Sequence, residues 1–177
     1  MENKNYLTLE EYSRFIETVN NKEDYLVFEI LYWCGLRLGE VLALTPVKNF
    51  NFDEKTILIE DKFKERDRKV IVPASLMSEL EIYIKSKRNG RIFTNTKIYL
   101  HKKFERSLNA SGLQKIKLSE LWYSHIELFR RLGFKYKDYR SHLGYANYFL
   151  DEKKSLITQS DIAERLDVER RKLYKTN

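Results

Sequence analysis

The segment 24–34 (DYLVFEILYWC) is apolar on nearly every face, and this pattern predicts a helix that is buried all round. Gly35 interrupts the pattern, and residues 40–44 are typical of a second short helix that ends before Pro46. Residues 8–19 precede them with an amphipathic helical pattern that begins at a good capping residue, threonine. The first part of the chain is therefore expected to be a packed group of helices.

The period of the pattern changes once, in the middle of the first hundred residues. Residues 55–60 (KTILIE) and 69–72 (KVIV) are short and β-branched, which predicts two strands. The charged segment between them is expected to form a hairpin tip. Further helices are expected at residues 75–87, 100–110, 119–132, 139–150 and 158–174. The fold class predicted is mostly α with a small antiparallel β-sheet.

Composition limits the function. The chain has 177 residues, a length that suits one domain. Its net charge of +7 permits a nucleic acid or an acidic membrane surface as partner. The single cysteine, Cys34, excludes an internal disulfide and a cysteine-rich zinc site. His125 and His142 lack metal-ligand spacing and are expected to be structural. We therefore expect no metal and no cofactor. With neither a signal peptide nor an apolar stretch of about 18 residues, we expect a cytoplasmic protein without a membrane partner.

Arg37 is the first candidate site residue, within CGLRLGEVLAL at residues 34–44. It follows a glycine between two predicted helices, where a guanidinium can present a rigid fork to one phosphate while Glu40 holds its stem. The alternative is an Arg37–Glu40 pair that only closes the helix corner. The spacing favours neither interpretation over the other.

The hairpin tip is the second candidate. Its cations, interleaved with acidic residues, are Lys62, Lys64, Arg66, Arg68 and Lys69. A tight hairpin with this many cations can enter a DNA groove or grip phosphates. An ordinary solvated hairpin is an equal alternative.

These two signals, in this order, resemble the tyrosine recombinase family, which includes the phage integrases. YLTLEEYSRFIE resembles the opening of the catalytic domain of that family, CGLRLGEVLAL its first-arginine motif, and the hairpin before VIVPAS its catalytic-lysine hairpin. The resemblance implies the tyrosine recombinase catalytic-domain fold, with double-stranded DNA as partner. It places the first catalytic arginine at Arg37 and the lysine at Lys62, with Lys64 as second choice. The implied DNA contacts are Arg37, Lys62, Lys64, Arg66 and Arg68.

In this family arginines bind the scissile phosphate, the lysine helps to protonate the leaving 5′-oxygen, and a tyrosine attacks to form a 3′-phosphotyrosine. Here the sequence departs from the pattern. Without gaps, the His-x-x-Arg motif of the family falls on Ser119 and Trp122, the histidine of its Leu-Gly-His motif on Tyr145, and its nucleophile on Lys154. An indole cannot replace a guanidinium at a phosphate, and serine is a poor proton-transfer group. This alignment implies an inactive DNA-binding protein that regulates or represses a phage or mobile element, with a homo-oligomer on DNA compatible with that use.

A rival alignment keeps more of the chemistry. It uses Lys137 and Arg140 for the His-x-x-Arg motif and Tyr174 as the nucleophile, with Arg170 or Arg171 as a late cation, and it needs a long insertion before Lys137. It implies an active recombinase. A third hypothesis is a protein-interaction module with a vestigial site.

The C-terminal tail has two interpretations of its own. We expect an integrase-like domain at residues 1–154 and a helical tail at residues 155–177. The segment SDIAERLDVERRKLY resembles part of a helix-turn-helix, with a turn near Asp167 and a basic second helix. The alternative is a terminal helix that docks on the domain or on a neighbouring copy.

Overall fold

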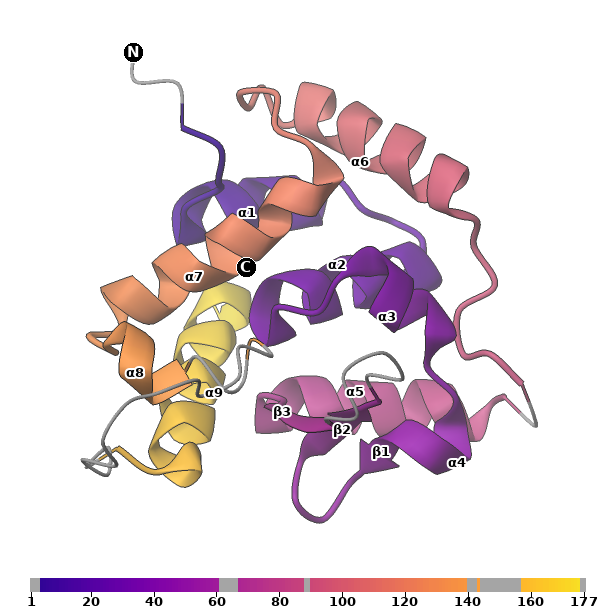
Figure 1. Cartoon of the computed structure of the whole chain (residues 1–177). Coiled ribbons are helices and arrows are strands. Elements are labelled where there is room, and N and C mark those ends of the chain that lie inside the picture. The colour runs from indigo at the N-terminus through magenta and orange to yellow at the C-terminus, as the bar shows by residue number, and fades with distance from the viewer. Residues whose placement is uncertain (1–3, 61–66, 88–89, 140–142, 144–156, 176–177) are drawn as a thin grey trace. The chain divides into compact units, whose positions relative to one another are not determined.

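The structure is a computed structural model, which describes residues 4–60, 67–87, 90–139, 143 and 157–175 (Figure 1). Its elements, in chain order, are α1 (Leu9–Glu17), α2 (Lys22–Cys34), α3 (Leu38–Ala43), α4 (Pro46–Asn49), β1 (Phe50–Asn51), β2 (Thr56–Ile59), β3 (Arg68–Ile71), α5 (Ala74–Lys85), α6 (Lys97–Ala110), the 3₁₀ turn η1 (Leu118–Glu120), α7 (Leu121–Arg131), α8 (Tyr136–Tyr139) and α9 (Gln159–Lys175). The predicted class, mostly α with a small antiparallel sheet, is confirmed.

The chain divides into two compact units. The first comprises Met1–Leu44 and Arg91–Leu128, and so holds α1, α2, α3, α6 and most of α7. The second comprises Thr45–Gly90 and Phe129–Asn177, and so holds the sheet, α4, α5, α8 and α9. The boundary expected at residues 154 and 155 lies outside the described residues.

The first unit is built around α2. As predicted, α2 is buried on nearly all sides, with ten of its residues buried, and its partner helices contribute aromatic rings to the same core. Phe15 of α1 packs against Phe28 of α2 with ring centroids 5.3 Å apart and against Phe104 of α6 at 5.0 Å. Thr8 caps α1 as expected, and the carboxylate of Glu11 accepts the Thr8 N–H in return at 2.9 Å.

Two carboxylates of the first turn of α2 hold the start of α6. Glu23 accepts hydrogen bonds from the backbone and the hydroxyl of Thr94 and from the backbone of Asn95. The fully buried Asp24 accepts from the side chains of Asn95 at 2.8 Å and Tyr99 at 2.9 Å. The N-terminal end of α6 is therefore fixed by hydrogen bonds as well as by apolar packing.

The second unit contains the sheet, in the order β1-β2-β3 with antiparallel pairs (Figure 1). The predicted β2–β3 hairpin is confirmed, with Ile59 opposite Arg68 at its tip end. Strand β1 was not predicted, because its two residues are too short to show an alternating pattern. The tip residues Lys62, Lys64 and Arg66 lie outside the described residues.

The sequence predicts a helix over residues 139–150 and a turn near Asp167 in the C-terminal part of the chain. A helix was expected over residues 139–150, but the structure has the short α8 ending at Tyr139, and most of the expected span lies outside the described residues. The expected turn near Asp167 is wrong, because α9 runs unbroken from Gln159 to Lys175. Its buried residues, among them Ile162, Leu166 and Leu173, keep one helical period, and the helix packs on α5 within its unit.

Candidate functional site

Arg37 stands at the corner between α2 and α3, as the N-cap residue of α3. Its backbone N–H donates to a carboxylate oxygen of Glu40 at 2.7 Å, which satisfies one of the free N–H groups at this helix start. The side chain of Arg37 is exposed, and within the described part of the chain its guanidinium forms no hydrogen bond or ion pair. Glu40 therefore closes the corner through the backbone of Arg37, and the guanidinium is left accessible.

The inner side of this corner rests on His125 of α7. Gly35 has a left-handed backbone with φ of 63°, and a Cβ at this position would lie only 2.9 Å from Cγ of the His125 ring. The ring is fully buried, and its Nδ1 lies 2.8 Å from the carbonyl oxygen of Tyr32. Burial lowers the pKa of His125 to about 4, so the imidazole is neutral at neutral pH. The expectation of a structural histidine agrees with this environment, whereas His142 lies outside the described residues.

Ser119 and Trp122 lie where a helix begins. Ser119 is exposed in η1, and Trp122 is half-buried in the first turn of α7, with its ring against Tyr123 at 5.3 Å. The gapless alignment places the His-x-x-Arg motif of the family on these two residues, and that motif is also expected at a helix start. Both residues belong to the same unit as Arg37.

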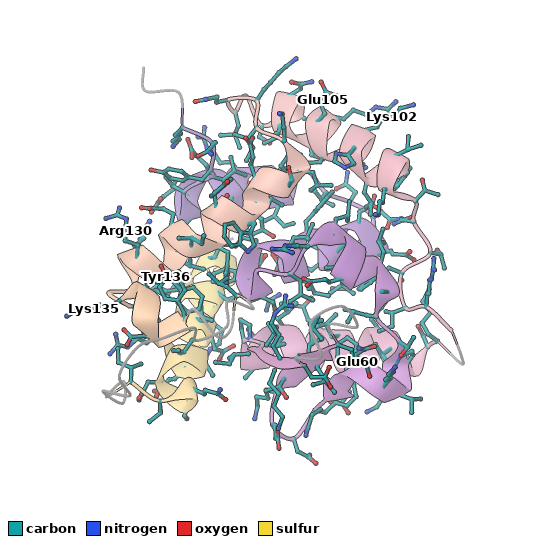
Figure 2. All side chains as sticks on the ribbon, in the orientation of Figure 1. Glu60, Lys102, Glu105, Arg130, Lys135 and Tyr136 are labelled. Atoms are coloured by element: carbon teal, nitrogen blue, oxygen red, sulfur yellow. The ribbon has the colours of Figure 1, made fainter. Side chains whose placement is uncertain are left out.

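The described residues at the base of the hairpin are largely paired. Lys69 of β3 bonds to Glu54 at 2.7 Å, and Lys48 of α4 bonds to Glu60, labelled beside the sheet in Figure 2, at 2.7 Å. Arg68 is half-buried in the first position of β3. Such exposed ion pairs contribute little to stability, so the lysines can exchange them for other anions at small cost.

The residues of the rival alignment are placed only in part. Arg140, as well as Tyr145 of the gapless alignment, lies outside the described residues, while Lys137 lies in α8 and its side chain is not described. Tyr174 is half-buried near the end of α9, and its ring centroid is 4.9 Å from the guanidinium of Arg170. Both Lys137 and Tyr174 belong to the second unit.

The cations expected to form a DNA-reading helix in the tail are engaged within the second unit. Arg170 is 2% exposed and donates to the hydroxyl of Ser75 at 2.9 Å and to the carboxylate of Glu79 at 2.6 Å. On the same helix, Arg171 pairs with Asp167 at 3.0 Å. Another oxygen of Asp167 accepts the backbone N–H of Ser75 at 2.7 Å, at the start of α5. Arg170 and Asp167 thus bind α9 to α5.

The outer face of α6 is a feature that the sequence analysis missed. Its exposed or half-exposed residues include the cations Lys97, Lys102, Lys103 and Arg106. Figure 2 shows Lys102 and Glu105 pointing away from the helix. The signal was present in the sequence, because these residues alternate at helical spacing with the buried Leu100, Phe104 and Leu108.

Lys97 also approaches the corner that carries Arg37. Its Nζ lies 3.7 Å from the place where a Cβ would stand on Gly39 of α3.

Among the described residues, no group of His, Cys, Asp and Glu side chains could hold a metal ion. In the same part of the chain, every helix is too short or too polar to cross a bilayer.

The family of the chain follows from its sequence as a whole. The profile of the phage integrase family matches residues 5–125, about two-thirds of the chain, and the protein belongs to this family. The tyrosine recombinase XerA of Pyrococcus horikoshii is 26% identical over 84 residues, which is 48% of this chain and 29% of that protein. A tyrosine recombinase of Pseudothermotoga lettingae is 33% identical over 82 residues, 46% of this chain and 28% of that protein. The matched segment therefore spans less than a third of the length of either relative.

Solved structures show the same fold. A crystal structure of XerA recombinase superposes with a TM-score of 0.68 at 20% identity, covering 97% of this chain and 64% of that one. XerH recombinase bound to its difH substrate gives 0.68 at 24% identity, covering 85% and 52%. The catalytic domain of bacteriophage HP1 integrase gives 0.63 at 17% identity, covering 97% and 94%. The expected tyrosine recombinase catalytic-domain fold is therefore confirmed.

Proposed function

We propose that this chain binds double-stranded DNA and that Arg37 contacts a backbone phosphate. The observation that carries the proposal is the exposed guanidinium of Arg37, on a corner whose backbone is held by Glu40. A guanidinium on a fixed support forms two parallel hydrogen bonds to phosphate oxygens with little loss of conformational entropy. The net charge of +7 and the DNA-bound structure of the similar XerH recombinase support the same partner.

The hairpin cations are proposed as further DNA contacts. We assign phosphate contacts to Lys62, Lys64, Arg66 and Arg68, because a hairpin can follow a groove while its cations replace condensed counterions. We also propose that more than one copy of the protein binds to one duplex. The mass of the protein–DNA complex in solution gives the number of bound copies.

We further propose that the domain does not cleave DNA and serves to regulate or repress a phage or mobile element. The family match includes Ser119 and Trp122 and ends at residue 125, before Lys137 and Tyr174. An indole carries no charge to balance a phosphate in the transition state, and a serine hydroxyl stays protonated near pH 7 and so is a poor general acid or base. Arg37 and Lys62 then remain as binding residues taken over from a catalytic set.

The test of DNA binding is a titration of a short labelled duplex of arbitrary sequence at several salt concentrations. Substituting Arg37→Ala should lower the affinity about tenfold, as expected for the loss of about 1.4 kcal/mol from a charge-assisted contact, and reduce the salt slope by about 0.9. Arg14→Ala, at an exposed arginine of α1, controls for the loss of one surface charge. If the unmodified protein shifts no duplex even at low salt, the DNA-binding proposal fails and a protein-interaction module becomes the better hypothesis.

An active recombinase is the second candidate, using Arg37, Lys62, Lys137, Arg140 and Tyr174. The observation in its favour is that Tyr174 is partly exposed near the end of α9, beside the Arg170 guanidinium. A nicked suicide substrate distinguishes the two, because it traps a covalent 3′-phosphotyrosine. An adduct that disappears in Tyr174→Phe establishes the active enzyme. Duplex binding without any adduct supports the inactive DNA-binding protein.

A further inference from the structure

We propose that His125 is a positioning residue for Arg37: its buried imidazole fixes the α2–α3 corner from which the guanidinium reaches DNA. The inference rests on the proposed phosphate contact of Arg37. It concerns a residue that lies on α7, far from Arg37 in sequence, yet in the same compact unit.

The first contact is the hydrogen bond to the end of α2. The carbonyl group of Tyr32 lies in the last turn of that helix, where carbonyl groups lack the usual helical donor. A carbonyl oxygen can only accept, so Nδ1 of His125, 2.8 Å away, carries the proton and donates it. Burial disfavours the charged form and lowers the pKa of the ring to about 4, so the imidazole is neutral at neutral pH.

The second contact is steric. The edge of the ring occupies the space next to Gly35 that a Cβ would need, with Nε2 at 2.8 Å from that position. Only glycine combines this approach with the left-handed backbone. Leu36, the next residue, is 1% exposed and buries the chain just before Arg37. The two residues that precede Arg37 are thus held from the inside.

Helix α7 is itself secured, so His125 is a firm support. The neighbouring Ser124 is fully buried, and its hydroxyl accepts the backbone N–H of Leu7 at 2.9 Å. On the outer side of the corner, Glu40 holds the N–H of Arg37. With both sides fixed, the Arg37 backbone has little freedom, and loss of the inner support should let the guanidinium sample many orientations.

Two substitutions separate the parts played by His125. His125→Leu keeps a side chain of similar bulk at this position but removes the N–H donor to the Tyr32 carbonyl group. His125→Asn keeps an N–H donor at the place of Nδ1, because the amide of asparagine reaches about as far as that ring nitrogen. We expect His125→Leu to lower duplex affinity about as much as Arg37→Ala, roughly tenfold, and His125→Asn to restore most of that loss. Thermal unfolding and circular dichroism identify the variants that fold.

The decisive measurement is a double-mutant cycle on duplex affinity with Arg37→Ala and His125→Leu. If His125 acts through Arg37, the second substitution adds little to the first. Equal loss from Arg37→Ala in both backgrounds would overturn the inference, because His125 would then affect only general stability. If Arg37→Ala has no effect even with His125 present, the phosphate contact itself is wrong, and both proposals are rejected on that distinct result. If His125→Leu does not fold, the cycle is run with His125→Gln, whose longer side chain carries its amide past the place of Nδ1 and so lacks the donor to Tyr32. Unchanged affinity in His125→Gln, or the same loss from Arg37→Ala in both backgrounds, overturns the inference, whereas a loss that is not additive supports it.

Discussion

Arg170 and Glu79 form an ion pair of 2.6 Å although 91 positions separate them in the chain. The arginine side chain is 2% exposed, whereas that of Glu79 is 31% exposed, so the pair joins a buried cation to an anion at the surface. A buried charge that loses its partner is costly, whereas a partly solvated carboxylate is less affected. The pair therefore stabilises the contact between α9 and α5 mainly because the buried Arg170 requires a carboxylate partner.

Removing either partner of this pair should destabilise the protein. We expect Glu79→Ala to lower the free energy of unfolding by about 2–3 kcal/mol, since the buried guanidinium of Arg170 loses the carboxylate that lies 2.6 Å from it. Lys172→Ala on the same helix breaks an exposed pair with Glu169 and should cost no more than about 0.5 kcal/mol. Urea unfolding measures both, and equal midpoints for the two variants would contradict the structural part assigned to Arg170.

The buried His125 should make stability depend on pH. Its pKa is about 4 in the folded protein and 6.5 in the unfolded chain, so between these values the unfolded state binds one more proton. The contribution to stability is fully present above pH 6.5 and is lost as pH falls towards 4, by about 3 kcal/mol in all. The observable is the difference in unfolding free energy between the native protein and His125→Asn across this range. Parallel pH profiles would show that the ring is not buried in its neutral form.

The cap of α1 gives a third prediction. The hydroxyl of Thr8 accepts the N–H of Glu11 at 3.3 Å, and the Glu11 carboxylate accepts from Thr8 and from Lys4. Burial raises the pKa of Glu11, but these hydrogen bonds outweigh it and hold the pKa below its usual value. Thr8→Ala should cost about 1 kcal/mol of unfolding free energy, whereas Thr8→Ser should be nearly neutral. Equal losses in both variants would mean that the methyl group of Thr8, rather than its hydroxyl, is what matters.

The anchor of α6 gives a fourth prediction. The hydroxyl of Tyr99 donates to the buried Asp24 at 2.9 Å, and chiefly this hydrogen bond raises the pKa of Tyr99. Tyr99→Phe should lower the unfolding free energy by about 1–2 kcal/mol, because one oxygen of a buried carboxylate loses its donor. Tyr123→Phe removes a hydroxyl from a tyrosine that is 45% exposed and should have little effect. Equal losses of unfolding free energy from the two substitutions, measured by urea unfolding, would contradict the prediction.

The hairpin gives a fifth prediction, on DNA binding. Combining Lys62→Ala with Lys64→Ala should weaken duplex binding and reduce the salt slope by about 1.8, since two phosphate contacts are lost. Lys85→Ala with Lys115→Ala, at two exposed lysines outside the hairpin, is the charge-matched control. Unchanged affinity and salt slope in the hairpin variant would place the hairpin away from the DNA.

Much of the fold could be predicted because its signals are local. The cap at Thr8 and the buried helix α2 are confirmed, as is the β2–β3 hairpin, and each depends on residues close together in the chain. The likeness of CGLRLGEVLAL to a family motif is local too, which is why Arg37 could be singled out. Strand β1 was missed for the same reason, since two residues carry no period.

The sequence by itself determined the class of fold, the family and the candidate arginine, because hydrophobic period, capping residues and short motifs are read along the chain. Only the tertiary structure decided what those residues touch. The basic helix of the tail is bound to α5 through Arg170 and Asp167, and the ring of His125 lies against Gly35. The physical reason is that burial and pairing join residues about ninety positions apart, and no pattern along the chain records which charge or ring will meet which partner.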